Sequence, residues 1–338
     1  MLQQWNLLGQ TPRRIIVAIL ALLLLAAGVL VDRSFRDSSH QLAMFDGGVP
    51  GTLEAAAALD FAHDNHIDQI ISYSVINASP KARDDYLVRA EQLRVKIVVS
   101  VKDLLGPTDL DPANAAFHSY FGYYVHPELK AAGKIPTTDQ QIEGIVKIFD
   151  PYPAVGGYYI SDELPQDPTG PEGFAKWQEP LRHRHAQIQS LSDKPTKVSL
   201  YWTANPQRAD FLRRVGPLTD ELMVAYYFYP EGAGHVLGGV AELRFAGQAL
   251  QAAAGEGGWF ILQAFSWDAE PETAANLGFA PGSPAPNAGV MVDMARRALD
   301  GGARNLALFS YGYMRKTPGQ DVQVAKALAE IRRLKDFS

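Results

Sequence analysis

Short apolar runs alternate along this chain with longer segments in which apolar residues recur every three or four positions. Most of the short runs are rich in Val, Ile, Leu, Phe and Tyr, and Gly, Pro, Asp or Asn bound them, which is typical of buried strands. After residue 40 the pattern predicts eight strands, at residues 42–49, 69–75, 96–101, 155–161, 197–202, 222–229, 259–265 and 305–311.

The segments between these runs have helical spacing. In residues 140–149, for example, Ile142, Ile145 and Phe149 fall on one face of a helix. Because strands that alternate with helices form parallel sheets with crossover connections, eight such units predict an α/β fold. With no domain-breaking linker between the units, we expect a single (β/α)8 TIM barrel over residues 38–338. The other segments that read as helices are 53–63, 81–93, 290–299 and 322–334.

Two long connections interrupt the regular alternation. Residues 104–137, after the third strand, contain several prolines and aromatic residues, and residues 268–288, after the seventh strand, are rich in Pro and Gly. Long loops that follow barrel strands usually shape the catalytic mouth. We therefore expect both connections at the same end of the barrel.

The first 37 residues differ from the rest of the chain. Arg13 and Arg14 precede an uncharged run of 17 residues, 15–31, which Asp32 closes. Basic residues before an apolar core are typical of export with the N-terminus left inside. We expect residues 1–37 to be an N-terminal transmembrane signal anchor and linker, which holds the barrel outside the cytoplasm, in the periplasm or the extracellular space. The alternative is a signal peptide that is cleaved, which would give a secreted protein.

Composition narrows the function classes. The chain has 338 residues, of which 47% are hydrophobic, enough for one large core. It has a net charge of −6 and no Lys/Arg-rich stripe after its N-terminus, so we expect no nucleic-acid partner. It has no cysteine, which excludes disulfides, thiolate metal sites and cysteine nucleophiles. The sequence indicates no particular oligomeric state.

The fourth predicted strand ends in two adjacent acids, Asp162 and Glu163, followed by Pro165. Because proline cannot donate to a ladder hydrogen bond, we expect pairing to stop there and the acids to lie where the strand becomes a loop. Repulsion between neighbouring carboxylates favours a proton on one of them. A carboxylic acid that stays protonated near neutral pH is what acid catalysis on an acetal oxygen requires. Asp162 is equally compatible with capping the segment that follows.

In a barrel the C-terminal ends of the strands meet at one mouth, so residues that close the predicted strands should share a site. These residues are rich in Tyr and Trp, with some acids and amides, a composition that suits sugar rings and their hydroxyls. Trp202 and Trp267 are also compatible with packing at the barrel rim, and Asp46 with a helix cap. The candidates for binding a carbohydrate are Asp46, Trp202, Tyr227, Gln263, Trp267 and Tyr311.

Other chemistries find no support in the sequence. No set of histidines lies at strand ends with metal-ligand spacing, so we expect no metal site. Gly-rich loops of the P-loop or dinucleotide-binding type are absent, and we expect no cofactor. A Gly-x-Ser-x-Gly elbow is also absent, which argues against a serine hydrolase.

The stretch Gly157-Tyr-Tyr-Ile-Ser-Asp-Glu-Leu-Pro165 resembles the fourth-strand Gly-x-Tyr-x-x-Asp-Glu-Pro signature of glycoside-hydrolase-like (β/α)8 barrels. Residues 261–267 and 291–311 are similar to the same group. The resemblance implies a barrel fold, a carbohydrate substrate and Glu163 as the catalytic acid/base. It also implies a second Glu at the end of the seventh strand, where this chain has Gln263 instead.

Three interpretations follow. A glycosidase would use Glu163 as its acid with a second carboxylate from Asp268, Asp46 or Glu231. Alternatively, Asp162 and Glu163 would work as a pair on a substrate whose own amide acts as the nucleophile. In the third interpretation the barrel binds glycans without cleaving them.

Overall fold

The computed structural model of the chain describes residues 40–46, 48–104, 131–132, 137–164, 171–202, 207–227, 240–269 and 285–334. The predicted anchor at residues 15–31 and most of the two long connections lie outside these residues. Among the helices of the described part, none is both long and apolar enough to cross a membrane.

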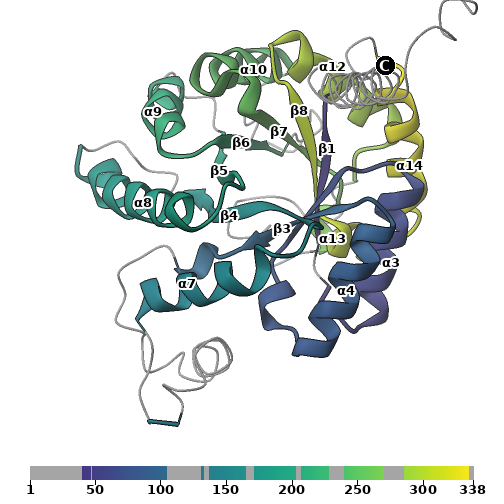
Figure 1. Cartoon of the computed structure of the whole chain (residues 1–338). Coiled ribbons are helices and arrows are strands. Elements are labelled where there is room, and N and C mark those ends of the chain that lie inside the picture. Colours follow the sequence, from purple (N-terminus) through teal and green to yellow (C-terminus); the bar gives the residue numbers. More distant parts are fainter. Residues whose placement is uncertain are drawn as a thin grey trace, which may run out of the picture. The chain divides into compact units, whose positions relative to one another are not determined.

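Eight parallel strands close into a barrel in the order of the chain (Figure 1). Each strand pairs with the next, and the last strand pairs with the first, for example Ala43 with Ala307. This confirms the predicted barrel. The strands are β1 (Leu42–Asp46), β2 (Gln69–Ser72), β3 (Lys96–Ser100), β4 (Val155–Leu164), β5 (Thr196–Tyr201), β6 (Glu221–Tyr226), β7 (Gly258–Gln263) and β8 (Asn305–Phe309).

Helices surround the strands in Figure 1. Polar residues that precede them explain where several of them begin: the side chain of Thr52 accepts from the backbone N–H of Ala55, and Thr137 and Gln140 form a capping box. The helices of the described residues are α3 (Leu53–Asp64), α4 (Pro80–Gln92), α7 (Thr138–Phe149), α8 (Pro171–Leu191), α9 (Gln207–Val215), α10 (Val240–Ala254), α12 (Ala288–Asp300), α13 (Tyr311–Lys316) and α14 (Gln320–Ile331).

Two hydrophobic clusters form the core, one between the strands and the helices and one inside the barrel. Alternation along each strand separates them, because successive side chains point to opposite faces. In β6, Leu222 and Val224 belong to the outer cluster, whereas Met223 and Ala225 belong to the inner one. The inner cluster is rich in aromatic rings, which also line the C-terminal end of the barrel.

Strand β4 departs from the expected ending. It continues through both acids to Leu164, so Asp162 and Glu163 are strand residues and not the start of a loop. Its pairing with β5 shifts register between Tyr159 and Ser161 and again before Leu164. A bulge of this kind re-aims the side chains that follow it. It explains why Asp162 reaches Tyr159, which belongs to the inner cluster, although strict alternation would put the two on opposite faces.

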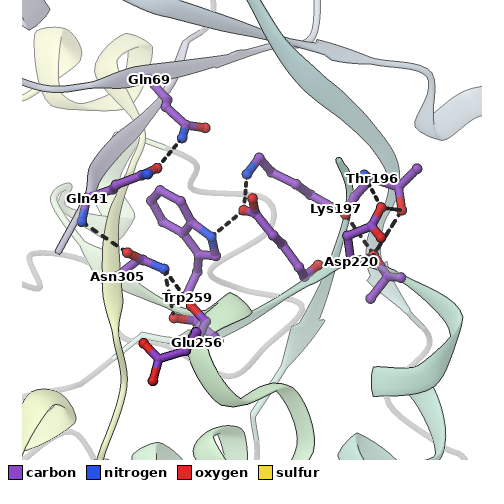
Figure 2. A network of polar contacts seen from close by, with 11 residues as sticks. Gln41, Gln69, Thr196, Lys197, Asp220, Glu256, Trp259 and Asn305 are labelled. Carbon is purple, nitrogen blue, oxygen red and sulfur yellow. Dashed lines mark hydrogen bonds and ion pairs between the residues drawn. The ribbon is translucent and has the colours of Figure 1, made fainter. Parts of the chain in front are cut away.

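A polar network closes the N-terminal end of the barrel (Figure 2). The ammonium of Lys197 contacts the carboxylate of Glu221, and the indole N–H of Trp259 donates to the same carboxylate over 2.5 Å. The Lys197 nitrogen also lies 4.8 Å from the centre of the Trp259 ring. Burial lowers the pKa of Lys197, although Glu221 acts against this shift. These contacts join β5, β6 and β7 at the first or second residue of each strand.

Candidate functional site

The Asp162 carboxylate lies at the C-terminal end of the barrel and receives donors from several elements. The hydroxyl of Tyr159 donates to its Oδ1 over 2.6 Å, and that of Ser199, on β5, lies 3.2 Å from the same oxygen. The hydroxyl of Tyr73, just after β2, donates to Oδ2 over 3.0 Å. Hydroxyl donors on both oxygens hold the carboxylate in one orientation.

Tyr159 is the buried part of this arrangement. Its hydroxyl also contacts the Ser199 oxygen over 2.5 Å, so these three side chains form one hydrogen-bonded group inside the barrel. Burial raises the pKa of Tyr159 well above its usual value, and the negative charge of Asp162 raises it further. Tyr159 therefore keeps its proton and remains a hydrogen-bond donor.

Lys102 completes the surroundings of Asp162. It is the first residue of the 3-10 turn η2 (Lys102–Leu104), which follows β3. Its ammonium lies 3.2 Å from Oδ2 of Asp162, and the two side chains are 29% and 23% exposed. The same nitrogen lies 4.8 Å from the centre of the Tyr73 ring. The site thus combines a carboxylate, a cation and hydroxyl donors in a partly exposed position.

Aromatic rings extend from this site across the barrel. Phe45 on β1 lies between Tyr73 and Phe309 on β8, with ring centroids 5.8 and 5.4 Å away. Phe309 in turn contacts Tyr227 and Tyr313 at 5.7 and 5.6 Å. The rings therefore form one continuous, largely buried cluster from the carboxylate side to the opposite side of the barrel, completed by Tyr159, Tyr201, Phe265 and Trp267.

Three of the predicted binding residues lie in this part of the molecule. Tyr227 and Trp267 belong to the inner cluster and contact each other edge to face at 6.0 Å. Gln263 ends β7 and is buried, and its amide nitrogen donates to the carbonyl of Phe265 over 3.0 Å. Its amide oxygen is buried without a hydrogen-bond partner in the described part of the chain. The residue before Tyr227, Tyr226, belongs to the outer cluster, because successive side chains of a strand point to opposite faces.

Two predicted binding residues are not brought to the site. Trp202 belongs to the outer cluster and packs against Phe245 of α10, with ring centroids 5.8 Å apart, because its neighbour Tyr201 takes the inward position. Tyr311 also belongs to the outer cluster and contacts Phe61 of α3 at 5.5 Å. Tyr313, two positions further along, provides the inward ring of α13.

The remaining predicted residues are only partly described. Asp46 is the last residue of β1 and Glu163 the second-last of β4, but the side chains of both lie outside the described residues. Glu231 also lies outside them. Asp268 is in the 3-10 turn η6 (Trp267–Ala269), where its backbone N–H donates to Ser266 over 3.1 Å and its side chain is exposed. Within the described chain, no cluster of three or more His, Asp and Glu side chains could hold a metal ion.

Sequence reasoning assigned no role to the partners of Asp162. Lys102 directly follows the third predicted strand and Tyr73 lies near the end of the second, whereas Tyr159 and Ser199 lie within strands. The signal that identifies them is alternation: Tyr159 faces away from Tyr158, and Ser199 falls between the outer residues Val198 and Leu200. Polar side chains on the inner face of a barrel strand are therefore worth including in a candidate site.

The fold and its strand-end carboxylate define a (β/α)8 barrel with a polar mouth. No known protein-family model matches the chain, and no curated protein sequence is similar to it. Solved structures resemble it in fold at low sequence identity.

Three of these structures illustrate the likeness. The GH5_18 protein of Streptomyces cattleya, a variant in complex with Manb1-4GlcNAc, has a TM-score of 0.54 at 12% identity, over 88% of this chain and 81% of that one. A chitinase from Bacteroides thetaiotaomicron has 0.52 at 10% identity, over 88% and 97%. The PgaB (BpsB) glycoside hydrolase domain from Bordetella bronchiseptica has 0.50 at 13% identity, over 88% and 99%. Of some other matched chains this protein spans only 52–57%. At such identities the likeness establishes the barrel fold.

Proposed function

We propose that this protein is a glycoside hydrolase that acts on a poly- or oligosaccharide, with Glu163 as its general acid/base and Asp162 as a fixed anion beside it. The observation that carries the proposal is the set of donors on Asp162. Tyr73, Tyr159 and Ser199 approach both carboxylate oxygens at a strand end, the position where barrel enzymes carry their chemistry.

The same contacts suggest different roles for the two acids. An acid catalyst must hold a proton and release it to the substrate. The Asp162 oxygens already accept hydrogen bonds from hydroxyls and face an ammonium, so we assign this side chain the role of the fixed anion and not that of the acid. Its negative charge favours a proton on the neighbouring Glu163, which then serves as the acid.

In the proposed reaction Glu163 donates its proton to the glycosidic oxygen as the bond from that oxygen to the anomeric carbon breaks. Positive charge then develops on the sugar ring. A water molecule adds to the anomeric carbon and returns a proton to the Glu163 carboxylate, which restores the acid. Asp162 stabilises the developing charge or orients a substrate amide that stabilises it. In the alternative route a second carboxylate takes part, supplied by Asp268, Asp46 or Glu231.

The partly exposed rings of the aromatic cluster support a carbohydrate substrate. Rings at the mouth, among them Tyr313 and Phe309, offer apolar faces that suit the C–H faces of sugars. The structures with a similar fold, a chitinase and two glycoside hydrolases, also support a carbohydrate substrate.

We further propose that residues 15–31 anchor the barrel outside the cytoplasm. The mass of the mature protein distinguishes an intact anchor from a cleaved signal peptide.

Hydrolysis of a panel of polysaccharides by the full chain and by Glu163→Gln tests the assignment. We expect the wild type to release reducing ends from at least one β-linked polymer, and Glu163→Gln to bind that polymer with nearly unchanged affinity but not to cleave it. Glu256→Gln, at an exposed carboxylate paired with Arg304, is the matched control and should keep full activity. Full activity of Glu163→Gln would show that another group is the acid.

A carbohydrate-binding barrel without catalysis is the second candidate. It is favoured by Gln263, an amide at the strand end where the resembling family carries a carboxylate. This alternative predicts that no polymer is cleaved, that Glu163→Gln changes glycan affinity little, and that Trp267→Ala weakens it. Calorimetric titration with the polymers of the same panel separates the two candidates.

A further inference from the structure

We propose that Lys102 is a positioning residue for the reaction: it holds the Asp162 carboxylate in its orientation and compensates its charge. The inference rests on the proposed function and assigns a role to a side chain that the acid pair alone does not explain.

The two oxygens of Asp162 are held from different sides. Oδ1 faces Tyr159 and Ser199, whose hydroxyls belong to β4 and β5. Oδ2 faces Tyr73 and the ammonium of Lys102, at 3.0 and 3.2 Å. Rotation of the carboxylate would break contacts on both oxygens at once. Lys102 therefore provides one of these two contacts to Oδ2.

Tyr73, which also contacts Oδ2 of Asp162, holds Lys102 in position. Its nitrogen lies 4.8 Å from the centre of the Tyr73 ring, so the ring face attracts the ammonium while the ring hydroxyl donates to Oδ2. An ammonium on a flexible stem gains a defined position from such a pair of contacts. Tyr73 and Lys102 thus act on Asp162 as one unit.

The charge of Lys102 matters because the other groups facing Asp162 in the described residues are neutral hydroxyls. Tyr159 is buried and retains its proton, and Ser199 is also buried. Lys102 is therefore the cation that balances the carboxylate, at a partly exposed position where the interaction is weaker than in a closed interior. Without it we expect the carboxylate to turn toward water.

The variants Lys102→Met and Lys102→Arg of the full chain test this role. We expect Lys102→Met to lower kcat by up to about 100-fold, the loss that a misplacement of about 1 Å can cause, with little change in KM. Lys102→Arg should recover most of kcat, because it restores the cation. Lys96→Met is the matched control: Lys96 begins β3, the strand that precedes Lys102, and donates to the carbonyl of Pro153 over 2.7 Å, and its loss should leave kcat unchanged.

Two outcomes would overturn the proposal. If Lys102→Met raises KM and leaves kcat intact, Lys102 contacts the substrate directly. If Lys102→Met and Lys102→Arg lose activity equally, its charge is not what the site uses. Lys102→Gln provides a second neutral variant should the methionine variant fail to fold.

A measurement without substrate separates this proposal from the proposed function. In crystal structures of the wild type and Lys102→Met, we expect Asp162 to lose its hydrogen bond to Tyr73 only in the variant. If the wild type cleaves no glycan but the variant shows this rotation, the proposed function fails while the positioning role stands. If Asp162 keeps both Tyr73 and Tyr159 as donors in the variant, Lys102 does not position it.

Discussion

Two groups of a lysine, a carboxylate and an aromatic ring lie at opposite ends of the same barrel. At the N-terminal end Lys197 contacts Glu221 and lies 4.8 Å from the centre of the Trp259 ring. At the C-terminal end Lys102 contacts Asp162 and lies 4.8 Å from the centre of the Tyr73 ring. The chemistry of the two groups is nearly the same.

Their exposure differs. The Lys197 side chain is 1% exposed, whereas that of Lys102 is 29% exposed. A buried ion pair couples its partners to the stability of the fold, because removing one leaves the other charge without compensation. A partly exposed pair stabilises the fold little but leaves its carboxylate within reach of a ligand. Burial therefore makes the Lys197 group part of the core, whereas the Lys102 group stays accessible to a ligand.

The largest expected effect is on stability, at the closed end. We expect Lys197→Met to lower the free energy of unfolding by about 3–5 kcal/mol, the cost of leaving the largely buried Glu221 carboxylate without its partner. Chemical denaturation followed by circular dichroism measures it. Arg304→Gln, which removes the exposed partner of Glu256, should change the same quantity by less than about 1 kcal/mol. Equal losses in the two variants would remove the distinction between the buried group and the exposed one.

At the open end the expected effect is on catalysis. Asp162→Asn keeps the shape of the side chain but removes its charge, and it places an N–H₂ group among hydroxyl donors and an ammonium. We expect kcat to fall about 10²–10³-fold, or about 2.7–4 kcal/mol, as for the loss of an electrostatic contact to a transition state. Asp210→Asn, at an exposed carboxylate on α9, is the control. Initial rates of hydrolysis of the cleaved polymer measure the effect. If both variants hydrolyse it as fast as the wild type, Asp162 does not have this role.

Much of the fold could be predicted from the sequence, because each strand is marked by an apolar run with clear boundaries. Residues 96–101 were predicted as the third strand, and the structure has Lys96–Ser100. The position of the acids at the mouth followed from counting strands. The predicted end of the fourth strand was wrong, since the bulge beside β5 carries the strand through Asp162 to Leu164. A register shift of this kind depends on the neighbouring strand and leaves no local mark in the sequence.

The site was harder to predict than the fold. Strands of a parallel barrel are buried on both faces, so an aromatic residue is compatible with either face. Trp202 and Tyr311 were assigned to the mouth on composition, yet both pack against helices outside the barrel. Lys102 and Tyr73 lie near the ends of the third and second strands, but their contact with Asp162 on the fourth joins separate strands and becomes visible only when the barrel closes.

The smallest expected effect separates the two faces of β4. Tyr158 lies in the outer cluster and Tyr159 in the inner one, and burial raises the pKa of both tyrosines. Above pH of about 10 an unfolded tyrosine loses its proton, while these folded ones retain theirs. The folded state then binds more protons, so the free energy of unfolding falls by about 1.4 kcal/mol per pH unit for each residue.

We therefore expect each of the variants Tyr158→Phe and Tyr159→Phe to lose less stability at alkaline pH, by the contribution of one tyrosine. Urea unfolding between pH of about 9 and about 11 measures the free energy of unfolding. Only Tyr159→Phe should also lower kcat near neutral pH, since it removes a hydroxyl that donates to Asp162 over 2.6 Å. Loss of a hydrogen bond to a charged group is worth about 1.5–3 kcal/mol. A fall in kcat for Tyr158→Phe would mean that the outer face of the strand also controls the site, and the boundary between structural and functional positions would then not follow the inner wall of the barrel.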